Sequence, residues 1–189
     1  MKLTEWIKAP VFRTEDVYNR LIDLASYQGK KVLVAFFRHA GCPFCNLRVH
    51  ALSKAHADLR LKGLEMIFFF ESRPSVILRS SFHQGVSPIP IISDPGKTWY
   101  QAYGIENSVM KSTVSHVTSF VQTAWKAQSA KVPLHLMASG ESFSTMPAEF
   151  LLDENLIIRK VHYAERLNDR LDLSEIVRFV NTGKITVDV

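Results

Sequence analysis

Two cysteines, Cys42 and Cys45, are the residues whose chemistry can be inferred most directly. They are the only cysteines in the chain, and their stretch joins an apolar run, Val32 to Phe37, to a helical pattern that begins near Phe44. A Cys-x-x-Cys pair between a strand and a helix is typical of a redox centre. The first thiol would lie at a helix N-terminus, where free N–H groups and the helix dipole stabilise the reactive thiolate.

The spacing of the two thiols also predicts how they would react. Thiols at positions i and i+3 of a helical turn can form a disulfide whose ring is so short that it restricts the unfolded chain little. We expect Cys42, as the more exposed and more acidic thiol, to attack a substrate, and Cys45 to resolve the intermediate. Arg38, His39 and Arg48 lie near the pair in sequence, and each could stabilise the thiolate.

Length and composition favour one domain that needs no disulfide support. The chain has 189 residues, of which 47% are hydrophobic, and no linker-like tract. We interpret residues 1–29 as an N-terminal extension and residues 105–145 as an insertion. Glu5 and Lys8 interrupt the place of a signal-peptide core, and no segment reaches the ~18 apolar residues of a membrane span. We therefore expect a soluble, cytoplasmic protein with no membrane partner.

The net charge of +5 does not indicate nucleic-acid binding. The 23 basic residues are spread among 18 acidic ones and form no run of five. We expect no nucleic-acid partner.

The order of apolar segments predicts the fold around the cysteines. Residues Val32 to Phe37 and Leu64 to Phe70 lack polar alternation, which favours parallel strands buried on both faces. Between them an i, i+4 apolar stripe predicts a helix that ends at Gly63. This crossover places the cysteines at the carboxyl end of the first strand, where α/β sheets bind their ligands.

The remaining segments complete the predicted topology. We expect a helix from Thr14 to Ala25, helices over 73–84, 96–103 and 113–131, a short strand within 86–95, a hairpin over 148–163, and a last helix capped by Asp172. The order β-α-β, then an antiparallel hairpin, then a helix, predicts an α/β thioredoxin-like fold. In it a central mixed sheet is flanked by helices, and a helical insertion precedes the C-terminal β-hairpin.

Four stretches carry a family resemblance and occur in one order along the chain. They are Val34 to Cys45, Ile92-Ser93-Asp94-Pro95, Ala102-Tyr103-Gly104 and Pro147 to Asp153. Together they resemble the AhpC/TSA-like group of peroxiredoxin-like proteins in the thioredoxin-fold superfamily. The resemblance covers roughly residues 30 to 180. It implies a thiol-based oxidoreductase with Cys42 as the nucleophile.

Two departures from the family pattern bear on the substrate. Peroxiredoxins usually read Pro-x-x-x-Thr/Ser-x-x-Cys, and this chain has Ala35 and His39 at the proline and hydroxyl positions. They also bring an arginine to the thiolate in an Arg-x-x-Phe pattern, where this chain has Pro147. A proline there is thioredoxin-like: a cis Met146–Pro147 bond would lie beside the cysteines and present backbone to a substrate disulfide.

The resemblance and the departures together define the expected site. Its catalytic residues would be Cys42, Cys45, Arg38 and His39, and its substrate-binding residues Pro43, Phe44, Met146 and Pro147. The substrate would be a peroxide or a disulfide, and no bound cofactor or metal would be needed. The reductant would be of the thioredoxin or glutathione type, because Cys-Pro-Phe-Cys also occurs in glutaredoxins. A homodimer is compatible with the sequence.

Three other interpretations stay open. The cysteines could be two ordinary buried thiols. They could contribute to a zinc site, for which His39 and His50 are the nearby additional ligands. The chain could also be a non-enzymatic redox-sensing or partner-binding module, whose oxidation state controls contact with a partner.

Overall fold

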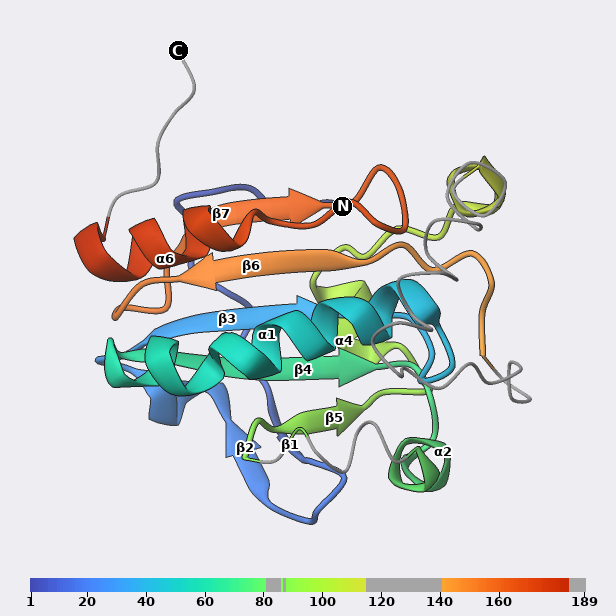
Figure 1. The fold of residues 1–189 in the computed structure, drawn as a ribbon, viewed down its shortest axis with the longest axis horizontal. Helices are drawn as coiled ribbons and strands as arrows, with labels where there is room; N and C mark the ends of the chain where they lie inside the picture. The colour runs from blue at the N-terminus through green and yellow to red at the C-terminus, as the bar shows by residue number, and fades with distance from the viewer. Residues whose placement is uncertain (81–85, 87, 115–140, 184–189) are drawn as a thin grey trace.

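A five-stranded mixed sheet forms the centre of the molecule (Figure 1). The computed structural model describes all of the chain except residues 81–85, 87, 115–140 and 184–189. The strands are β3 Lys31–Phe36, β4 Leu64–Phe70, β5 Ile91–Ser93, β6 Ala148–Leu152 and β7 Ile158–Tyr163, in the order β5-β4-β3-β6-β7. β3 is parallel to β4, and β4 to β5, whereas β6 runs antiparallel to both β3 and β7. The apolar run before the cysteines is therefore the central strand, as the sequence predicted.

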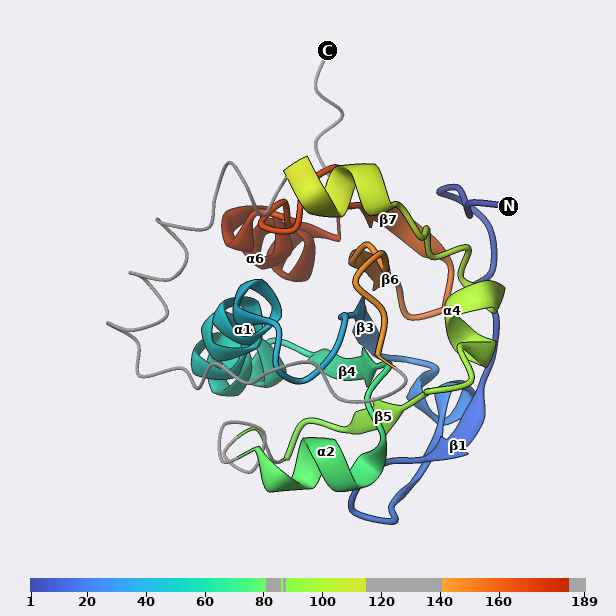
Figure 2. The ribbon, with the colours of Figure 1, turned by 90° about the vertical axis from the view of Figure 1, so that its right-hand side faces the viewer.

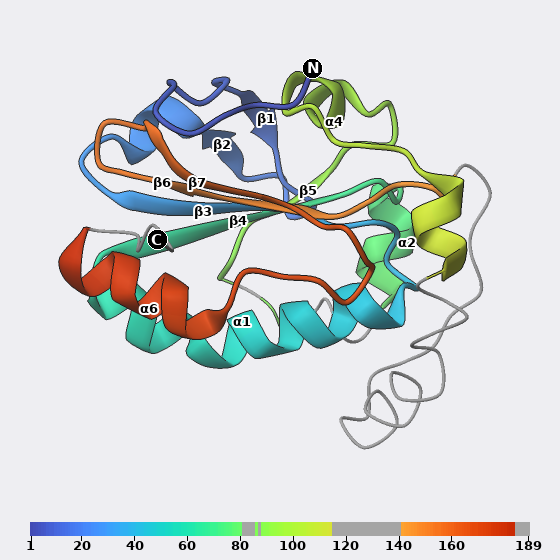
Figure 3. The same ribbon diagram turned by 90° about the horizontal axis from the view of Figure 1, so that it is seen from above.

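Helices and a small hairpin cover the two faces of this sheet. The helices are α1 Pro43–Leu61, α2 Pro74–Arg79, α4 Thr98–Ala102 and α6 Leu173–Thr182, with a 3-10 turn η1 at Leu24–Tyr27; the hairpin consists of β1 Arg13–Glu15 and β2 Leu21–Asp23. Helices α1 and α6 lie along one face, and β1, β2 and α4 lie over the other (Figure 3). Figure 2 shows the same layers along the strands. Among the described helices, none has the length and apolarity needed to cross a membrane.

The central strand shows why both faces are buried. Leu33 and Ala35 pack in the core under α1 and α6, and Val34 and Phe36 pack in the core under β2 and α4. All four side chains are completely buried. Successive strand residues point to opposite faces, so a strand covered on both sides needs an unbroken apolar run.

Local signals fix the ends of the two long helices. Helix α1 begins at Pro43. Proline is tolerated in the first turn because the N–H groups of this turn have no acceptor within the helix, so its lack of an N–H costs no hydrogen bond. The helix is followed by Gly63 at φ 88°, a left-handed conformation that glycine adopts without strain. At α6 the carboxylate of Asp172 accepts a hydrogen bond of 2.8 Å from the backbone N–H of Ser174, and Gly183 follows at φ 67°.

The prediction of a helix from Thr14 to Ala25 is wrong. The chain instead reverses between β1 and β2, which pair antiparallel. The carboxylate of Asp16 accepts hydrogen bonds of 2.9 Å from the backbone N–H groups of Tyr18 and Arg20. An aspartate that bonds the backbone ahead of it favours a turn over a helix.

Two other predictions fall partly outside the described residues. The helix expected over 73–84 is observed as α2, and residues 81–85 are not described. Of the helix expected over 113–131, residues 113 and 114 are helical and the rest lies outside the described part.

Candidate active site

Cys42 and Cys45 lie at the start of α1, directly beyond the carboxyl end of β3. Cys42 is the N-cap residue, and its carbonyl accepts the first helical hydrogen bond, 3.0 Å from the N–H of Asn46. Both residues are free thiols. Cys42 therefore occupies the helix N-terminus where a thiolate is favoured.

Both thiols are buried, which corrects one expectation. We expected Cys42 to be the more exposed thiol, but Cys42 is 1% and Cys45 0% exposed. They belong to the apolar core between α1, α6 and the sheet. The difference between the two cysteines is therefore one of acidity and contacts, since their accessibility is almost the same.

Arg38 is the cation that touches the nucleophile. Its side chain is completely buried, and its Nη1 lies 3.8 Å from the Sγ of Cys42. Its Nη2 donates to the carbonyl of Phe143 at 2.7 Å, and its guanidinium lies 5.5 Å from the centre of the Phe143 ring. The backbone N–H of Arg38 donates to the Sγ of Cys45 at 3.4 Å. One residue thus contacts both sulfur atoms.

The two thiols have opposite acidities. Burial is the largest influence on the pKa of Cys42 and raises it, but a hydrogen bond from Cys45 and the charge of Arg38 outweigh burial and lower that pKa to about 6. Burial and the same hydrogen bond raise the pKa of Cys45 well above its ordinary value. At neutral pH, Cys42 is therefore a thiolate that accepts a hydrogen bond from the Cys45 thiol.

The loop between β3 and α1 is fixed from two sides. The backbone N–H of Ala40 donates to the Oγ of Ser72 at 2.7 Å, and its carbonyl accepts from the side chain of Asn46 at 3.0 Å. The N–H of Cys42 donates to the carbonyl of His39 at 3.0 Å. The backbone before the nucleophile is thus held by hydrogen bonds from α1 and from the end of β4.

The imidazole of His39 lies beside a buried carboxylate. Its Nδ1 lies 3.5 Å from Oε2 of Glu141, and both side chains are more than nine-tenths buried. The other carboxylate oxygen of Glu141 accepts a hydrogen bond from Ser72. His39 and Ser72 therefore join Glu141 to the loop that carries Cys42.

Residues 141–146, which we call the 141–146 segment, lie against the cysteine loop. Besides the contacts of Glu141 and Phe143, the N–H of Ser142 donates to Glu71 at 2.9 Å, and the hydroxyl of Thr145 donates to the same carboxylate at 2.7 Å. Lys97 pairs with Glu71 at 3.0 Å. The segment is thus attached both to the end of β4 and to the residues that precede Cys42.

Arg48, which the sequence also suggested as a partner of the thiolate, forms a buried ion pair with Glu149. Its Nε and Nη2 donate to the two carboxylate oxygens of Glu149 at 2.8 and 2.7 Å. Arg170 lies beside the same carboxylate, with its Nε 3.9 Å from Oε1 of Glu149. The charge of Arg170 acts on Cys42 and on Cys45 and lowers the pKa of both. Sequence reasoning missed Arg170 and Glu149; a carboxylate between Ala148 and Phe150 in an apolar strand was the available signal.

The expected substrate-binding residues surround the same end of the sheet. Pro43 is half-buried at the first turn of α1, and Phe44 is buried in the core with both cysteines. Met146 lies in that core too, and the carbonyl of Pro147 accepts a hydrogen bond from Ala164 at 3.0 Å. A cis Met146–Pro147 bond and direct substrate contacts stay predictions.

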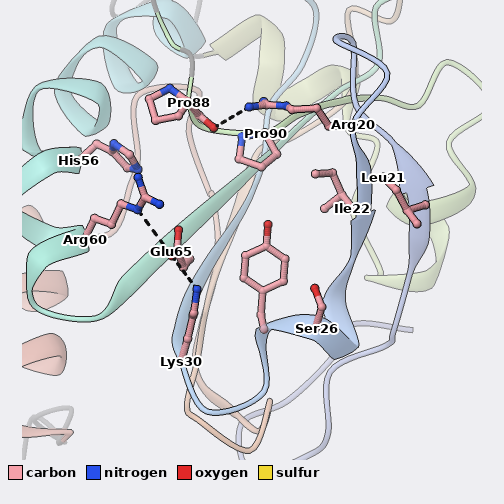
Figure 4. A pocket seen from close by; sticks show the side chains of 11 residues that line it. Arg20, Leu21, Ile22, Ser26, Lys30, His56, Arg60, Glu65, Pro88 and Pro90 are labelled. Atoms are coloured by element: carbon pink, nitrogen blue, oxygen red, sulfur yellow. Dashed lines mark hydrogen bonds and ion pairs between the residues drawn. The ribbon is translucent and has the colours of Figure 1, made fainter.

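The described part of the chain shows no cluster of three or more His, Cys, Asp or Glu side chains that could hold a metal ion. A pocket of about 440 Å³ lies at the opposite end of the sheet from the cysteines. It is lined by Lys30, Arg60 and His56, among others, and Glu65 pairs with Lys30 at 3.1 Å and with Arg60 at 3.7 Å (Figure 4). The redox chemistry does not use this pocket.

The fold and the site define the class of protein. A reactive thiolate and a second thiol at the carboxyl end of a central parallel strand are the components of a thiol oxidoreductase. Residues 7–161 match the AhpC/TSA family, so the chain belongs to that family.

Individual proteins agree with this assignment. "Putative peroxiredoxin Rv2521" of Mycobacterium tuberculosis is 29% identical over 119 residues, which span 61% of this chain and 74% of that protein. Among solved structures, the thiol peroxidase from Chromobacterium violaceum has a TM-score of 0.64 at 17% identity, covering 97% of this chain and 89% of its own. A "putative Thiol:disulfide interchange protein DsbE" from Chlorobium tepidum has a TM-score of 0.64 at 16% identity, covering 95% and 99%. These structures share the thioredoxin fold with this chain.

Proposed function

We propose that this thiol oxidoreductase reduces peroxides, with Cys42 as the nucleophile and Cys45 as the resolving thiol. One observation carries the proposal: the two adjacent thiols differ in acidity, because Cys42 has a pKa of about 6 and the pKa of Cys45 is raised well above its ordinary value. Attack requires a thiolate, and only Cys42 supplies one at neutral pH.

The proposed cycle balances in three steps. The Cys42 thiolate attacks one oxygen of the O–O bond, which breaks, so that Cys42 becomes a sulfenic acid and the other oxygen leaves and takes up a proton. The Cys45 sulfur then attacks the sulfenic sulfur, which releases water and forms the Cys42–Cys45 disulfide. An external thiol pair of the thioredoxin or glutathione type returns two electrons and two protons and restores both thiols.

The burial of Cys42 favours a peroxide over a protein disulfide. The residue is 1% exposed, and the 141–146 segment lies against the loop that carries it. A small peroxide needs less space than a disulfide, which must align its S–S bond with the attacking sulfur. A disulfide substrate is the second candidate, supported by Pro147 at the position where peroxiredoxins have an arginine and by the interchange protein among the structural neighbours.

His39 is a catalytic residue in this proposal, as is Arg38. Arg38 stabilises the thiolate directly. His39, paired with Glu141, lies three residues before the N-cap Cys42 and would exchange the proton that the leaving oxygen takes up. Residues Pro43, Phe44, Met146 and Pro147 would form the walls that contact the substrate. A cytoplasmic location and a homodimer stay predictions.

The test is a comparison of two oxidants. Fully reduced protein is mixed with hydrogen peroxide or with glutathione disulfide, and the loss of free thiols is followed over time. We expect hydrogen peroxide to react with the reduced protein at least tenfold faster than with a free thiol such as glutathione. The substitution Cys42→Ser should abolish this reaction. Faster reaction with the disulfide would replace the peroxidase proposal by disulfide exchange. Slow reaction with both oxidants would favour a non-enzymatic redox sensor.

A further inference from the structure

Arg170 is a buried cation that lies outside the Cys-x-x-Cys loop and has no role in the proposed cycle. It lies in the segment that joins β7 to α6, and its side chain is 9% exposed. Its Nη1 donates to the carbonyl of Asp169 at 2.7 Å. Its Nη2 is buried and has no hydrogen-bond partner among the described residues. Burying a guanidinium without hydrogen-bond partners costs free energy unless a negative charge nearby compensates for it.

The carboxylate beside Arg170 is already satisfied by another arginine. Glu149 receives two short hydrogen bonds from Arg48 and a third, of 3.1 Å, from the backbone N–H of Leu171. Arg170 approaches the same carboxylate only to 3.9 Å. Two guanidinium groups thus share one carboxylate, and a net positive charge is left in the buried cluster.

This cluster adjoins the dithiol. Arg48 follows Cys45 by one turn of α1, and both residues are buried on the inner side of that helix. Leu171, next to Arg170, packs in the same apolar core as both cysteines. The segment that precedes α6 runs past the N-terminal half of α1 (Figures 2 and 3). The cluster is therefore attached to the same helix and the same apolar core as the dithiol.

The other charged groups around the dithiol do not remove this excess. Arg38 contacts Cys42 from the loop, and His39 is paired with Glu141. Asp172, two residues after Arg170, is also acted on by the charge of Arg48, but its carboxylate is exposed to solvent, which screens it. Among the buried groups described around the dithiol, the Cys42 thiolate is a negative charge that a second cation can stabilise.

We propose that Arg170, held in place by Glu149, is a positioning residue that supplies a second positive charge to the dithiol and so favours the thiolate of Cys42. Arg38 approaches the sulfur from the loop before α1, and Arg170 acts from the segment before α6. The proposal rests on the proposed function, in which Cys42 is the nucleophile. It makes the start of α6 part of the redox site, although this segment contains no residue of the Cys-x-x-Cys loop.

The test titrates Cys42 without any oxidant. The ultraviolet absorbance of the thiolate is followed against pH in the reduced protein, in Arg170→Gln and in the control Arg166→Gln, which removes an exposed arginine from the same segment. We expect the pKa of Cys42 to rise from about 6 to about 7 in Arg170→Gln and to stay unchanged in the control. Arg170→Lys, which keeps the charge, should restore most of the difference.

The rate of alkylation supplies a second readout. A rise of one in the pKa slows alkylation about eightfold near pH 5.5 and changes it less than about twofold near pH 8. General damage to the fold would slow or speed the reaction at both pH values. Arg170→Met, which keeps the apolar stem packed, replaces Arg170→Gln if that variant does not fold.

The outcomes separate this proposal from the proposed function. An unchanged pKa in Arg170→Gln, or an equal rise in Arg166→Gln, would overturn the role of Arg170 and leave the peroxidase proposal intact. Failure of the parent protein to reduce peroxide would overturn the proposed function and leave the titration result standing.

Discussion

The guanidinium of Arg38 joins the nucleophile to a segment that lies about a hundred residues further along the chain. Its Nη1 lies 3.8 Å from the Sγ of Cys42, and its Nη2 donates to the carbonyl of Phe143 at 2.7 Å. The same side chain therefore stabilises the thiolate and holds the 141–146 segment against it. Four predictions follow from this arrangement and from the charges around it.

Replacing Arg38 should make Cys42 a weaker nucleophile. In Arg38→Met the thiolate loses its contacting cation, and we expect the pKa of Cys42 to rise by more than in Arg170→Gln. Alkylation near pH 6 should slow about tenfold or more. Arg38→Lys should recover part of the rate. An Arg38→Met protein that is alkylated at the parent rate near pH 6 would contradict the role of this residue.

Removing a hydroxyl from Ser72 should loosen the 141–146 segment. Ser72 accepts a hydrogen bond from Ala40 and donates one to Glu141. Only the bond to Glu141 holds the segment, and its net loss of about 1 kcal/mol corresponds to about fivefold more opening, and so to about fivefold faster reaction of Cys42 with a bulky aromatic disulfide. Ser53→Ala, which removes a hydroxyl bonded within α1, is the control. Equal rates in the two variants would show that the segment does not limit access.

The stability of the reduced protein should depend on the ionisation of Cys42. Folding lowers the pKa of this thiol from its ordinary 9.0 to about 6, so the folded state binds fewer protons between these values. The stabilisation is present in full above pH 9 and is lost as pH falls through 6. Denaturant unfolding between pH 8 and 6 should therefore show falling stability in the parent protein and a flatter profile in Cys42→Ser. Parallel profiles would contradict the lowered pKa.

Glu149 should be more important for stability than any exposed carboxylate. In Glu149→Gln two arginines lose their buried counter-ion, which we expect to cost about 3–5 kcal/mol of unfolding free energy. Glu154→Gln removes an exposed carboxylate that pairs with Lys31 at 3.7 Å and should change stability by less than about 1 kcal/mol. Urea denaturation of both variants checks the difference, and equal midpoints would show that the buried cluster is not structural.

How much of this could be predicted from the sequence depends on how local each signal is. The strands β3 and β4 were predicted correctly, and so was the helix between them, which was expected to begin near Phe44 and to stop at Gly63 and is observed as Pro43–Leu61. A strand buried on both faces and an amphipathic helix leave continuous patterns in the sequence. The helix expected at Thr14 was wrong because the side-chain bonds of Asp16 favour a turn there. Apolar spacing alone does not reveal such bonds.

The residues of the candidate site also fall into those that the sequence could predict and those that it could not. The cysteines and Arg38 are close in sequence, and the structure brings them together. Glu141 and Arg170 come from distant segments with no motif of their own, so only the folded chain shows that they reach the cysteine loop or the cluster beside the dithiol. Arg48 is an instructive contrast, because its position one turn after Cys45 suggested a thiolate partner, whereas it is held by Glu149.

The central claim is that Cys42 attacks and Cys45 resolves, and intact-protein mass spectrometry with peptide mapping tests it most directly. Reduced protein, Cys42→Ser and Cys45→Ser are each treated with equimolar hydrogen peroxide at neutral pH. We predict that the parent protein loses two hydrogen atoms as the disulfide forms, that Cys45→Ser gains one oxygen on Cys42, and that Cys42→Ser stays unmodified. Oxidation of Cys45 in Cys42→Ser at the parent rate, with Cys42 unreactive in Cys45→Ser, would contradict the assignment of the two thiols.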